Sequence, residues 1–486
     1  MSPLDHFRES LARPDLRSWI RDGLIGERAQ VHGPYGAKPL IYADYVASGR
    51  ALAQVEDFIR DEVLPYYANS HTQASYCGAF STRLREAARA EIARLTGAGE
   101  GTTVIFAGSG STAGINRVLG LVDIAGTLAR GARAVVLVGP YEHHSNLLPW
   151  RESGAEVVEI PEADAGGPDM AALERALEAA RGAELIVGTF SAASNVTGIL
   201  TDADAVTRLL KRHGALAIWD YGCGAPYVAM DMRSGTDAAK DAIVFSPHKF
   251  PGGPGASGVL VVRDAVARRS TPTLPGGGTV SFVSPWGHAY SSHLADREEG
   301  GTPNVVGDIR AALAMLVKEA LDQDWLSSRQ QALRDRALAV WRQNPRIEIL
   351  GNLGAASLPI FSFRIRDASG NLVHHQFFTR LLSDLHGIQA RGGCACAGSY
   401  AHRLLNLGKA ESDAMFAALD SGAEMEKPGW VRLNLSALMS DDKVERIITA
   451  VNSLAMVASD YLPDYQADPS TARFSPRHPV EESLAS

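Results

Sequence analysis

The sequence predicts an α/β protein with a large domain on a mainly parallel sheet, followed by a smaller α+β C-terminal domain. Three observations predict this architecture. Between about residues 100 and 265, short Val- and Ile-rich runs alternate with helical patterns, as in strands buried on both faces of a parallel sheet. Long helical patterns follow over residues 311–345, and the chain then mixes strands and helices. At 486 residues, the chain is also long enough for two domains.

Seven apolar runs are the expected strands of the large domain. They cover residues 103–108, 133–138, 155–160, 184–190, 215–220, 242–246 and 258–262. Amphipathic patterns at residues 169–181 and 202–214 predict helices between these strands. Gly214 suits the end of the second helix, because glycine adopts the left-handed conformation of a C-terminal cap without strain.

The C-terminal part of the chain has its own expected elements. Strands are predicted at residues 358–365 and 430–435, and helices at residues 374–387 and 441–459. The resulting division is an N-terminal arm (1–40), a large domain (41–310), a small domain (311–462) and a tail (463–486). The tail carries Pro, Ser and charged residues without periodicity, so we expect it to be flexible.

Composition excludes several classes of protein. Lys and Arg total 47 against 55 Asp and Glu, a formal charge of −8, which argues against general binding of nucleic acid or anionic membranes. No apolar run approaches the roughly 18 residues of a membrane span, and the charged N-terminus lacks the apolar core of a signal peptide. Four cysteines in so long a chain do not predict a disulfide framework. We therefore expect a cytoplasmic protein.

A lysine directly after a predicted strand is the first candidate for chemistry. Residues 245–262 read FSPHKFPGGPGASGVLVV, so Lys249 follows a strand and precedes a Pro- and Gly-rich segment. A lysine fixed in this way can form a Schiff base, and burial lowers the pKa of such an amine. Taken alone, however, a loop lysine more often faces solvent.

Other strand ends supply side chains that can hold a cofactor. Asp220 ends the strand at 215–220, where a carboxylate can keep the pyridine nitrogen of pyridoxal 5′-phosphate (PLP) protonated, although such an Asp more often begins a loop. The segment GSGSTAGIN (108–116) leads into a helix N-terminus, which is a natural phosphate cradle but also common structural punctuation. Parallel strands build their site at their carboxyl ends, so the joint occurrence of these segments is more specific than any one of them.

Two further strand ends complete the set. YEHHSNLLPW (141–150) contains His143, which can stack on a planar cofactor or simply lie at the surface. SAASNVTG (191–198) contains Asn195, which can bond a phenolic oxygen or make a turn. No second group of ligands stands at metal spacing, so we expect no metal.

Together these segments resemble the class V aminotransferase family, especially its cysteine desulfurase and selenocysteine-lyase-like branch. The resemblance covers about residues 40–460 and includes YADYVASGR (42–50), EHHSN, SNVTG, SPHK and GGTPN (300–304). It implies an aspartate-aminotransferase-like fold of type I, PLP as the cofactor and an amino acid as the substrate. It also implies a homodimer with shared sites.

The resemblance assigns a role to each matching residue. It implies that Lys249 forms the Schiff base, Asp220 pairs with the ring nitrogen, His143 stacks on the ring and Asn195 contacts the ring hydroxyl. The residues that would bind the phosphate are Ser111, Thr112, Ser246 and His248, with Gly301 and Thr302 reaching the phosphate of the partner subunit.

Two segments near the C-terminus match the substrate and sulfur sites of these desulfurases. RGGCACAGSY (391–400) resembles the loop with the sulfur-accepting cysteine, and its register selects Cys396 rather than Cys394. WVRLNLSALMSDDKVERI (430–447) resembles the strand whose arginine binds the substrate carboxylate, which makes Arg432 the anchor. A guanidinium suits this role because it binds a carboxylate in bidentate fashion.

Three departures from the family pattern bear on the substrate. Cys223 replaces a Gln that follows the ring-binding Asp by three residues, and Ala395 replaces the His before the catalytic cysteine. A polar insert near residues 407–428 lengthens the interval between Cys396 and Arg432, and this insert can form a lid or a partner site.

The favoured function is therefore a PLP-dependent cysteine desulfurase that converts L-cysteine to L-alanine through a persulfide on Cys396, with a sulfur-acceptor protein as a further partner. The alternative is a lyase, epimerase or aminotransferase of the same family that acts without a persulfide, because fold alone does not separate these activities. A third hypothesis is a sulfur-transfer partner or regulatory scaffold, which measurable turnover would exclude.

Overall fold

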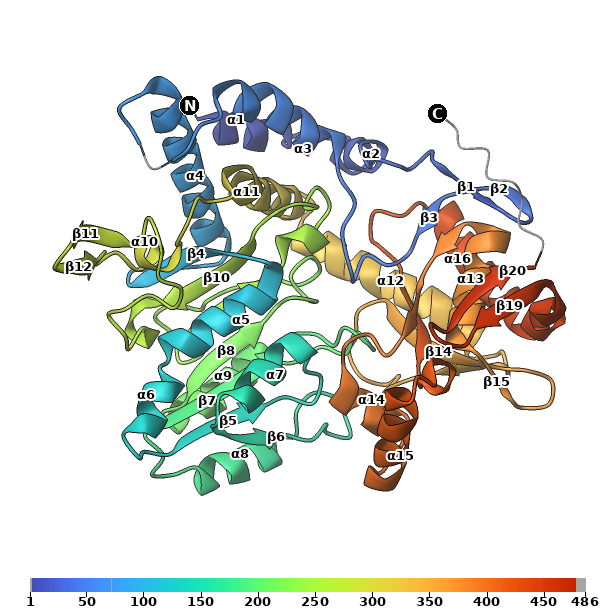
Figure 1. Ribbon diagram of the computed structural model, residues 1–486. Coiled ribbons are helices and arrows are strands. Elements are labelled where there is room, and N and C mark those ends of the chain that lie inside the picture. Colours follow the sequence, from blue (N-terminus) through green and yellow to red (C-terminus); the bar gives the residue numbers. More distant parts are fainter. Residues whose placement is uncertain (1, 71, 478–486) are drawn as a thin grey trace. The chain divides into compact units, whose positions relative to one another are not determined.

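The computed structural model describes residues 2–70 and 72–477, and it divides into two compact units (Figure 1). The first unit contains the N-terminal segment up to Ile25, Ser48–Ser194 and Leu200–Leu326. The second unit contains Gly26–Ala47, Asn195–Ile199 and the chain from Ser327 onward. Among the described residues, no helix combines the length and the apolar character that a bilayer crossing requires.

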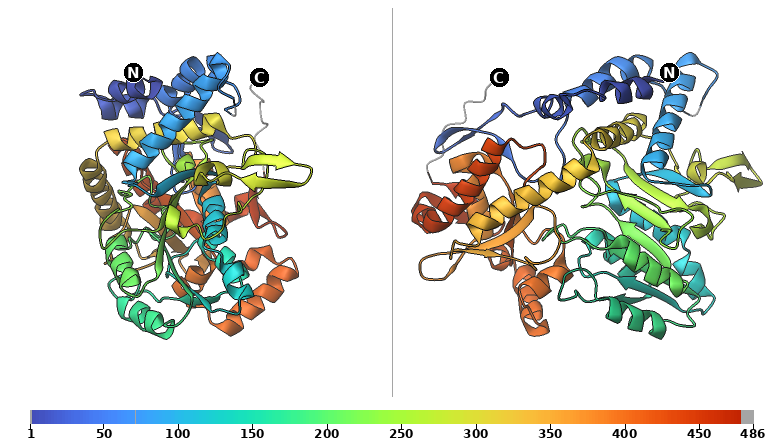
Figure 2. Two further views of the ribbon diagram at one scale, coloured as in Figure 1. Left: turned by 90° about the vertical axis from the view of Figure 1, so that its left-hand side faces the viewer. Right: turned by 180° about the vertical axis from the view of Figure 1, so that it is seen from behind.

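A seven-stranded sheet forms the centre of the first unit (Figures 1 and 2). Its strands, in spatial order, are β4 (Thr102–Gly108), β10 (Gly258–Arg263), β9 (Ala242–Phe245), β8 (Leu216–Asp220), β7 (Leu185–Ser191), β5 (Ala134–Val138) and β6 (Glu156–Glu159). Only β10 runs antiparallel to its neighbours. The seven predicted strands and the mainly parallel sheet are thus confirmed.

Helices cover both faces of this sheet, which explains why apolar residues stand at both odd and even positions of its strands. Residues of α5 (Gly110–Leu121), α6 (Ile124–Ala129) and α7 (Leu148–Glu152) pack with Val187 of β7 in one core. The next residue, Gly188, points to the opposite face, where it lies against Leu210 of α9 (Ala203–Arg212). The helices predicted at 169–181 and 202–214 are confirmed as α8 (Met170–Ala179) and α9, and Gly214 has the expected positive φ of 71°.

The first unit also contains the following helices and strands. They are α1 (Pro3–Ser10), α2 (Leu16–Asp22), α3 (Ala53–Phe58), η1 (Ile59–Val63), η2 (Leu64–Tyr66), α4 (Tyr76–Leu95), β11 (Val280–Ser284), β12 (Gly287–Tyr290), α10 (Leu294–Glu298) and α11 (Val305–Ala320). Helix α11 is buried along most of its length, and it packs against α4. The first unit therefore continues to Leu326, beyond the predicted boundary at 310.

An antiparallel sheet forms the second unit. Its strand order is β13 (Ile347–Ile349), β14 (Ile360–Arg366), β18 (Trp430–Asn434) and β17 (Arg391–Gly393), and β15 (Leu372–Val373) pairs with β14. The helices of this unit are most of α12 (Gln323–Trp341), α13 (His375–His386), α14 (Gly398–Leu404), α15 (Lys409–Asp420) and α16 (Asp441–Val457). Trp341, Phe363 and Leu433 belong to one buried core. The predicted strands and helices of this region are therefore present.

Two segments differ from the predicted domain boundaries. Residues 26–47 belong to the second unit, because β3 (Ile41–Tyr42) pairs in parallel with β16 (Ile388–Gln389). The flexible tail predicted from 463 is wrong for residues 463–477, where β19 (Tyr465–Asp468) and β20 (Arg473–Pro476) form a hairpin. Tyr465 is buried and donates to Asp384, which anchors the hairpin to α13. The rest of the predicted tail, residues 478–486, lies outside the described part of the chain.

Candidate active site

The first set of candidate residues lies on loops at one edge of the seven-stranded sheet. The strands β4, β5, β7, β8 and β9 share one direction, so their carboxyl ends meet at this edge. Lys249 ends the short helix η4 (Pro247–Lys249) that follows β9, and it is half-buried. A Cβ added at Gly253 would lie 1.8 Å from the Pro247 carbonyl oxygen, so the glycine-rich run lets the backbone fold back tightly beside Lys249.

Asp220 lies at the end of β8, and it is electrostatically coupled to Lys249. The Asp220 side chain is buried, and Gly222 donates its backbone N–H to Oδ1 at 2.7 Å. Burial raises the pKa of Asp220, whereas the Gly222 bond, the charge of Lys249 and a hydrogen bond from Ser111 lower it. The structure thus brings these three predicted residues together.

The N-terminus of α5 converges with the loop after β9. The Ser111 backbone N–H donates to Ser246 Oγ at 2.8 Å. Gly110 has a positive φ of 62°, and a Cβ added there would lie 2.9 Å from Ser246 Oγ and 3.3 Å from His248 Cε1. Burial and the charge of Lys249 lower the pKa of His248, which favours the neutral imidazole. A helix N-terminus lined with hydroxyls and a neutral imidazole donor suits a phosphate group.

His143 and Thr112 meet at Ser145. The Ser145 backbone N–H donates to His143 Nδ1 at 3.1 Å, and Ser145 Oγ lies 3.0 Å from the same nitrogen. Ser145 Oγ also lies 2.7 Å from Thr112 Oγ1. These contacts fix the orientation of the imidazole ring after β5.

Several candidate residues of the second unit lie on the loop between β17 and α14. Cys396 is exposed on this loop, whereas Cys394 is partly buried. Ala395 and Cys396 both have positive φ values, 54° and 55°, which is uncommon for residues other than glycine. Asn195 Nδ2 donates to the Ala395 carbonyl at 2.7 Å and so holds this strained turn.

Arg432 is placed on β18 by two contacts within the second unit. Its Nη2 donates to Asp44 Oδ1 at 2.8 Å, and its Nη1 donates to the Asn195 carbonyl at 3.1 Å. Arg391, the register partner of Arg432, binds the other Asp44 oxygen at 3.0 Å. Two guanidinium groups therefore share one carboxylate, which leaves one positive charge for an anionic ligand. Arg432 Nε and Asn195 Oδ1 are buried without a hydrogen-bond partner among the described residues, as expected of groups that serve a ligand.

Sequence reasoning missed two carboxylates at these sites. Asp44 lies within YADYVASGR, but the two arginines that bind it lie in distant segments of the chain. Glu142 precedes His143, and it is buried with three hydrogen bonds from Asn146 and Ser191. The position of Glu142 in the sequence, between a buried strand and two histidines, was the signal that could have identified it.

Gly301 and Thr302 lie on an exposed segment between α10 and α11 of the first unit. The nearby hairpin of β11 and β12 also exposes apolar side chains, with Phe282 63% and Trp286 92% exposed. Exposed apolar surface of this kind is typical of a protein interface.

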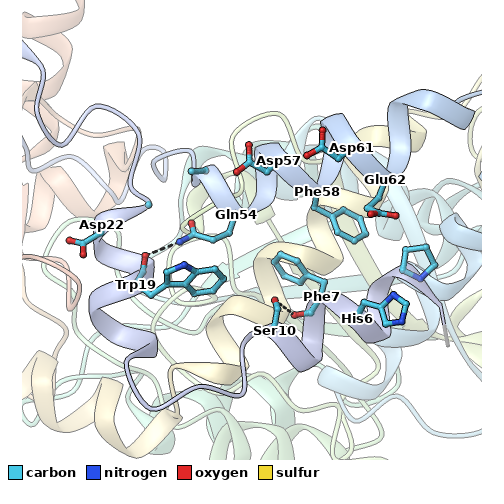
Figure 3. Close-up of a pocket in the computed structure, with 13 residues that line it drawn as sticks. His6, Phe7, Ser10, Trp19, Asp22, Gln54, Asp57, Phe58, Asp61 and Glu62 are labelled. Carbon is cyan, nitrogen blue, oxygen red and sulfur yellow. Dashed lines mark hydrogen bonds between the residues drawn. The ribbon is translucent and has the colours of Figure 1, made fainter.

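A separate groove of about 580 Å³ lies between α1, α2 and α3 (Figure 3). Phe7, Trp19 and Phe58 line it, with Asp57 and Asp61 along one rim. None of the predicted site residues belongs to this groove. Within the described part of the chain, no cluster of His, Cys, Asp and Glu side chains suits a metal ion.

Comparisons with known proteins agree with this geometry. Residues 41–447 match the model of the family "Aminotransferase class-V". A "Probable cysteine desulfurase" of Vibrio cholerae is 31% identical, over 85% of this chain and 93% of its own length. A "Cysteine desulfurase" of Serratia proteamaculans is 28% identical, over 74% of this chain and 85% of its own length.

Solved structures show the same fold. An apo cysteine desulfurase from Thermococcus onnurineus superposes with a TM-score of 0.70 at 23% identity, over 86% of this chain and 94% of the other. The cysteine desulfurase CsdA from Escherichia coli superposes with a TM-score of 0.68 at 22% identity, over 92% of this chain and 99% of the other. The predicted fold class is thereby confirmed.

Proposed function

Because this chain belongs to the class V aminotransferase family, we propose that it is a PLP-dependent cysteine desulfurase, which converts L-cysteine to L-alanine. The observation that carries the proposal is the exposed thiol of Cys396, on a strained turn that Asn195 holds. The relatives from Vibrio cholerae and Serratia proteamaculans are named as cysteine desulfurases, which supports the same reaction.

The residues at the sheet edge fit PLP. The N-terminus of α5, Ser246 and His248 would hold the phosphate, and Thr112 would contribute its hydroxyl. His143 would stack on the ring, and Asn195 would offer its amide to the ring hydroxyl. When bound, PLP accepts the electrons that the substrate's Cα–H bond releases. Asp220 would hold the proton of the ring nitrogen, while Lys249 would bind the cofactor covalently and then remove the Cα proton.

Cys396 would take the sulfur. Its thiolate attacks the sulfur of the bound substrate, so that a bond between the two sulfur atoms forms while the bond between the substrate's Cβ and sulfur breaks. The electron pair of the broken bond stays with the carbon fragment, which takes up one proton at Cβ and one at Cα, the second replacing the proton that Lys249 removed, and leaves as alanine. The enzyme retains a persulfide for transfer to an acceptor protein.

Arg432 would bind the substrate carboxylate, because its guanidinium and Arg391 together carry more charge than Asp44 neutralises. We expect Arg432→Gln to raise the KM for L-cysteine by about 10- to 100-fold, since a charge-assisted hydrogen bond is lost. Steady-state kinetics measure this change. Arg336→Gln removes an exposed guanidinium from α12 and should leave KM unchanged. An unchanged KM in a folded Arg432→Gln protein would refute the assignment.

A lyase, epimerase or aminotransferase is the second candidate function. The replacements at Cys223 and Ala395 favour it, because they alter side chains that the family pattern places beside the ring and the thiol. One incubation with a panel of amino acids, which measures alanine, sulfide, pyruvate and racemisation together, separates the two candidates. Alanine and sulfide from L-cysteine are expected; racemisation or transamination without sulfide would favour the second, and the absence of all turnover would favour a scaffold.

We further propose a cytoplasmic homodimer in which Gly301 and Thr302 complete the phosphate site of the neighbouring subunit. The exposed apolar side chains of the β11–β12 hairpin support a subunit interface in this region. Mixing Lys249→Ala and Thr302→Ala subunits, each inactive alone, should restore activity, because each mixed dimer regains one intact site. Activity assays after subunit exchange measure this recovery, with each variant exchanged against itself as the control. A monomer in solution, or no recovery, would contradict the proposal.

A further inference from the structure

Glu142 is a buried acid that the reaction outlined above does not use. It lies in the turn after β5, and only 5% of the residue is exposed. The Ser191 backbone N–H donates to Glu142 Oε1 at 2.8 Å, and the Ser191 hydroxyl donates to Oε2 at 2.8 Å. Asn146 Nδ2 also donates to Oε2. Both carboxylate oxygens are therefore engaged away from solvent.

The partners of Glu142 are themselves fixed. Asn146 is fully buried, and its Oδ1 accepts from Trp150 Nε1 at 3.1 Å and from Thr189 Oγ1 at 2.7 Å. A Cβ added at Gly139 would lie 2.5 Å from Glu142 Oε1, so the backbone approaches the acid closely. A network in which every member is satisfied rigidifies the segment around it.

This network joins the two predicted cofactor residues that flank it. Glu142 immediately precedes His143 in the chain. Its partner Ser191 stands opposite Asp220 in the register of β7 and β8, and the next residue, Ala192, donates its N–H to the Asp220 carbonyl at 2.9 Å. A shift of Glu142 would therefore move both His143 and the strand pair that carries Asp220.

Glu142 is also electrostatically coupled to Asp220. The pKa of Glu142 is raised to about 7, because burial outweighs the hydrogen bonds from Ser191 and Asn146, which lower it, and repulsion from Asp220 adds to the rise. Among the described residues, Asp220 is the charged group that acts on the acid, since Ser191 and Asn146 are neutral. Each proton that Glu142 takes up near neutral pH therefore favours the ionised form of Asp220.

We propose that Glu142 is a positioning residue for the cofactor site, which aligns His143 with Asp220 and controls the charge at Asp220 through its own proton. The inference relies on the proposed function only in taking PLP as the ligand. The Asp220 carboxylate would be most fully ionised, and best suited to a protonated ring nitrogen, while Glu142 holds its proton.

Glu142→Gln tests this role, because the amide keeps the size of the side chain but places an N–H₂ group against the donors Asn146 and Ser191. We expect the dissociation constant for PLP to rise about tenfold or more, as judged by equilibrium dialysis, because a buried hydrogen-bond network loses acceptors. The Ser191 amide should exchange its hydrogen faster in the protein without PLP. Asp241→Asn is the matched control: Asp241 is a buried carboxylate before β9, at the opposite edge of the sheet.

The pH dependence of unfolding gives a readout that needs no cofactor. The pKa of Glu142 is higher in the folded protein than its ordinary value of 4.5, so its contribution to stability is fully present below about pH 4.5. That contribution is lost as pH rises through about 7. The free energy of unfolding of the wild type should therefore fall over this range, whereas Glu142→Gln should not show this fall. If the Gln variant does not fold, Ser191→Ala removes one donor to Glu142 and tests the same role with the opposite sign. Because that hydrogen bond lowers the pKa of Glu142, its removal should enlarge the loss of stability with rising pH.

Failure of the role proposed for Glu142 can be distinguished from failure of the proposed function. Wild-type protein that binds no PLP would refute the proposed function, whereas the unfolding and exchange measurements would still report on Glu142. The inference is overturned if Glu142→Gln matches the wild type in PLP affinity, in Ser191 exchange and in the pH dependence of unfolding.

Discussion

Lys249→Ala should lose at least about a thousandfold in the rate of alanine formation from L-cysteine, because in the proposed function Lys249 both attaches the cofactor and removes the Cα proton. The half-buried position of Lys249 after β9, within electrostatic reach of Asp220, is the physical basis for this effect. Alanine release and borohydride labelling of the holoenzyme measure it. In the wild type, reduction should fix PLP to the peptide that contains Lys249.

Lys409→Ala is the control for this experiment. Lys409 is an exposed lysine on α15, and its ion pair with Asp413 lies on the surface, so its loss should change neither labelling nor turnover. Label on another lysine, or turnover by Lys249→Ala near the wild-type rate, would refute the assignment.

Cys396→Ser should lower alanine formation from L-cysteine at least about 100-fold, because a serine hydroxyl is not ionised at neutral pH and cannot form the persulfide. Binding of PLP should remain intact, since Cys396 is exposed on the loop after β17 and is not among the residues proposed to hold the cofactor. Assays of alanine and sulfide, together with the absorption spectrum of the holoenzyme, measure the two effects.

Cys394→Ser is the matched control, because it changes the same atom two residues away. It should retain a substantial fraction of activity, since the match to the desulfurase loop selects Cys396 and the Cys394 side chain is partly buried. Normal turnover of L-cysteine by Cys396→Ser would exclude the persulfide route and favour a lyase or transferase.

The strands of the first unit were predictable because each is a short apolar run buried on both faces. Val187 contacts the core on one side of the sheet, and Gly188 contacts α9 on the other, so both faces of the strand are covered. The same periodicity placed Lys249 and Asp220 at strand ends, where parallel strands collect functional residues. The close approach of Ser111, Ser246 and His248 followed from that topology.

Contacts between distant segments were not predictable from local patterns. Asp44 binds Arg391 and Arg432, which are more than three hundred residues away in the chain. The left-handed turn at Ala395 and Cys396 depends on a hydrogen bond from Asn195, and nothing in the local sequence indicates it. The sequence predicts a flexible tail where the C-terminal hairpin lies, because the anchors of the hairpin, Tyr465 and Phe474, are isolated aromatic residues in a polar segment.

The central claim is that sulfur passes from L-cysteine to Cys396. A single turnover with one equivalent of L-cysteine, without reductant or acceptor, followed by intact mass and peptide mapping, tests it most directly. We expect one added sulfur atom on the peptide that contains Cys396, equal in amount to the alanine formed and removed by a thiol reductant. Alanine formed without added sulfur on the protein, or sulfur that remains on the protein after Cys396→Ser, would contradict the claim.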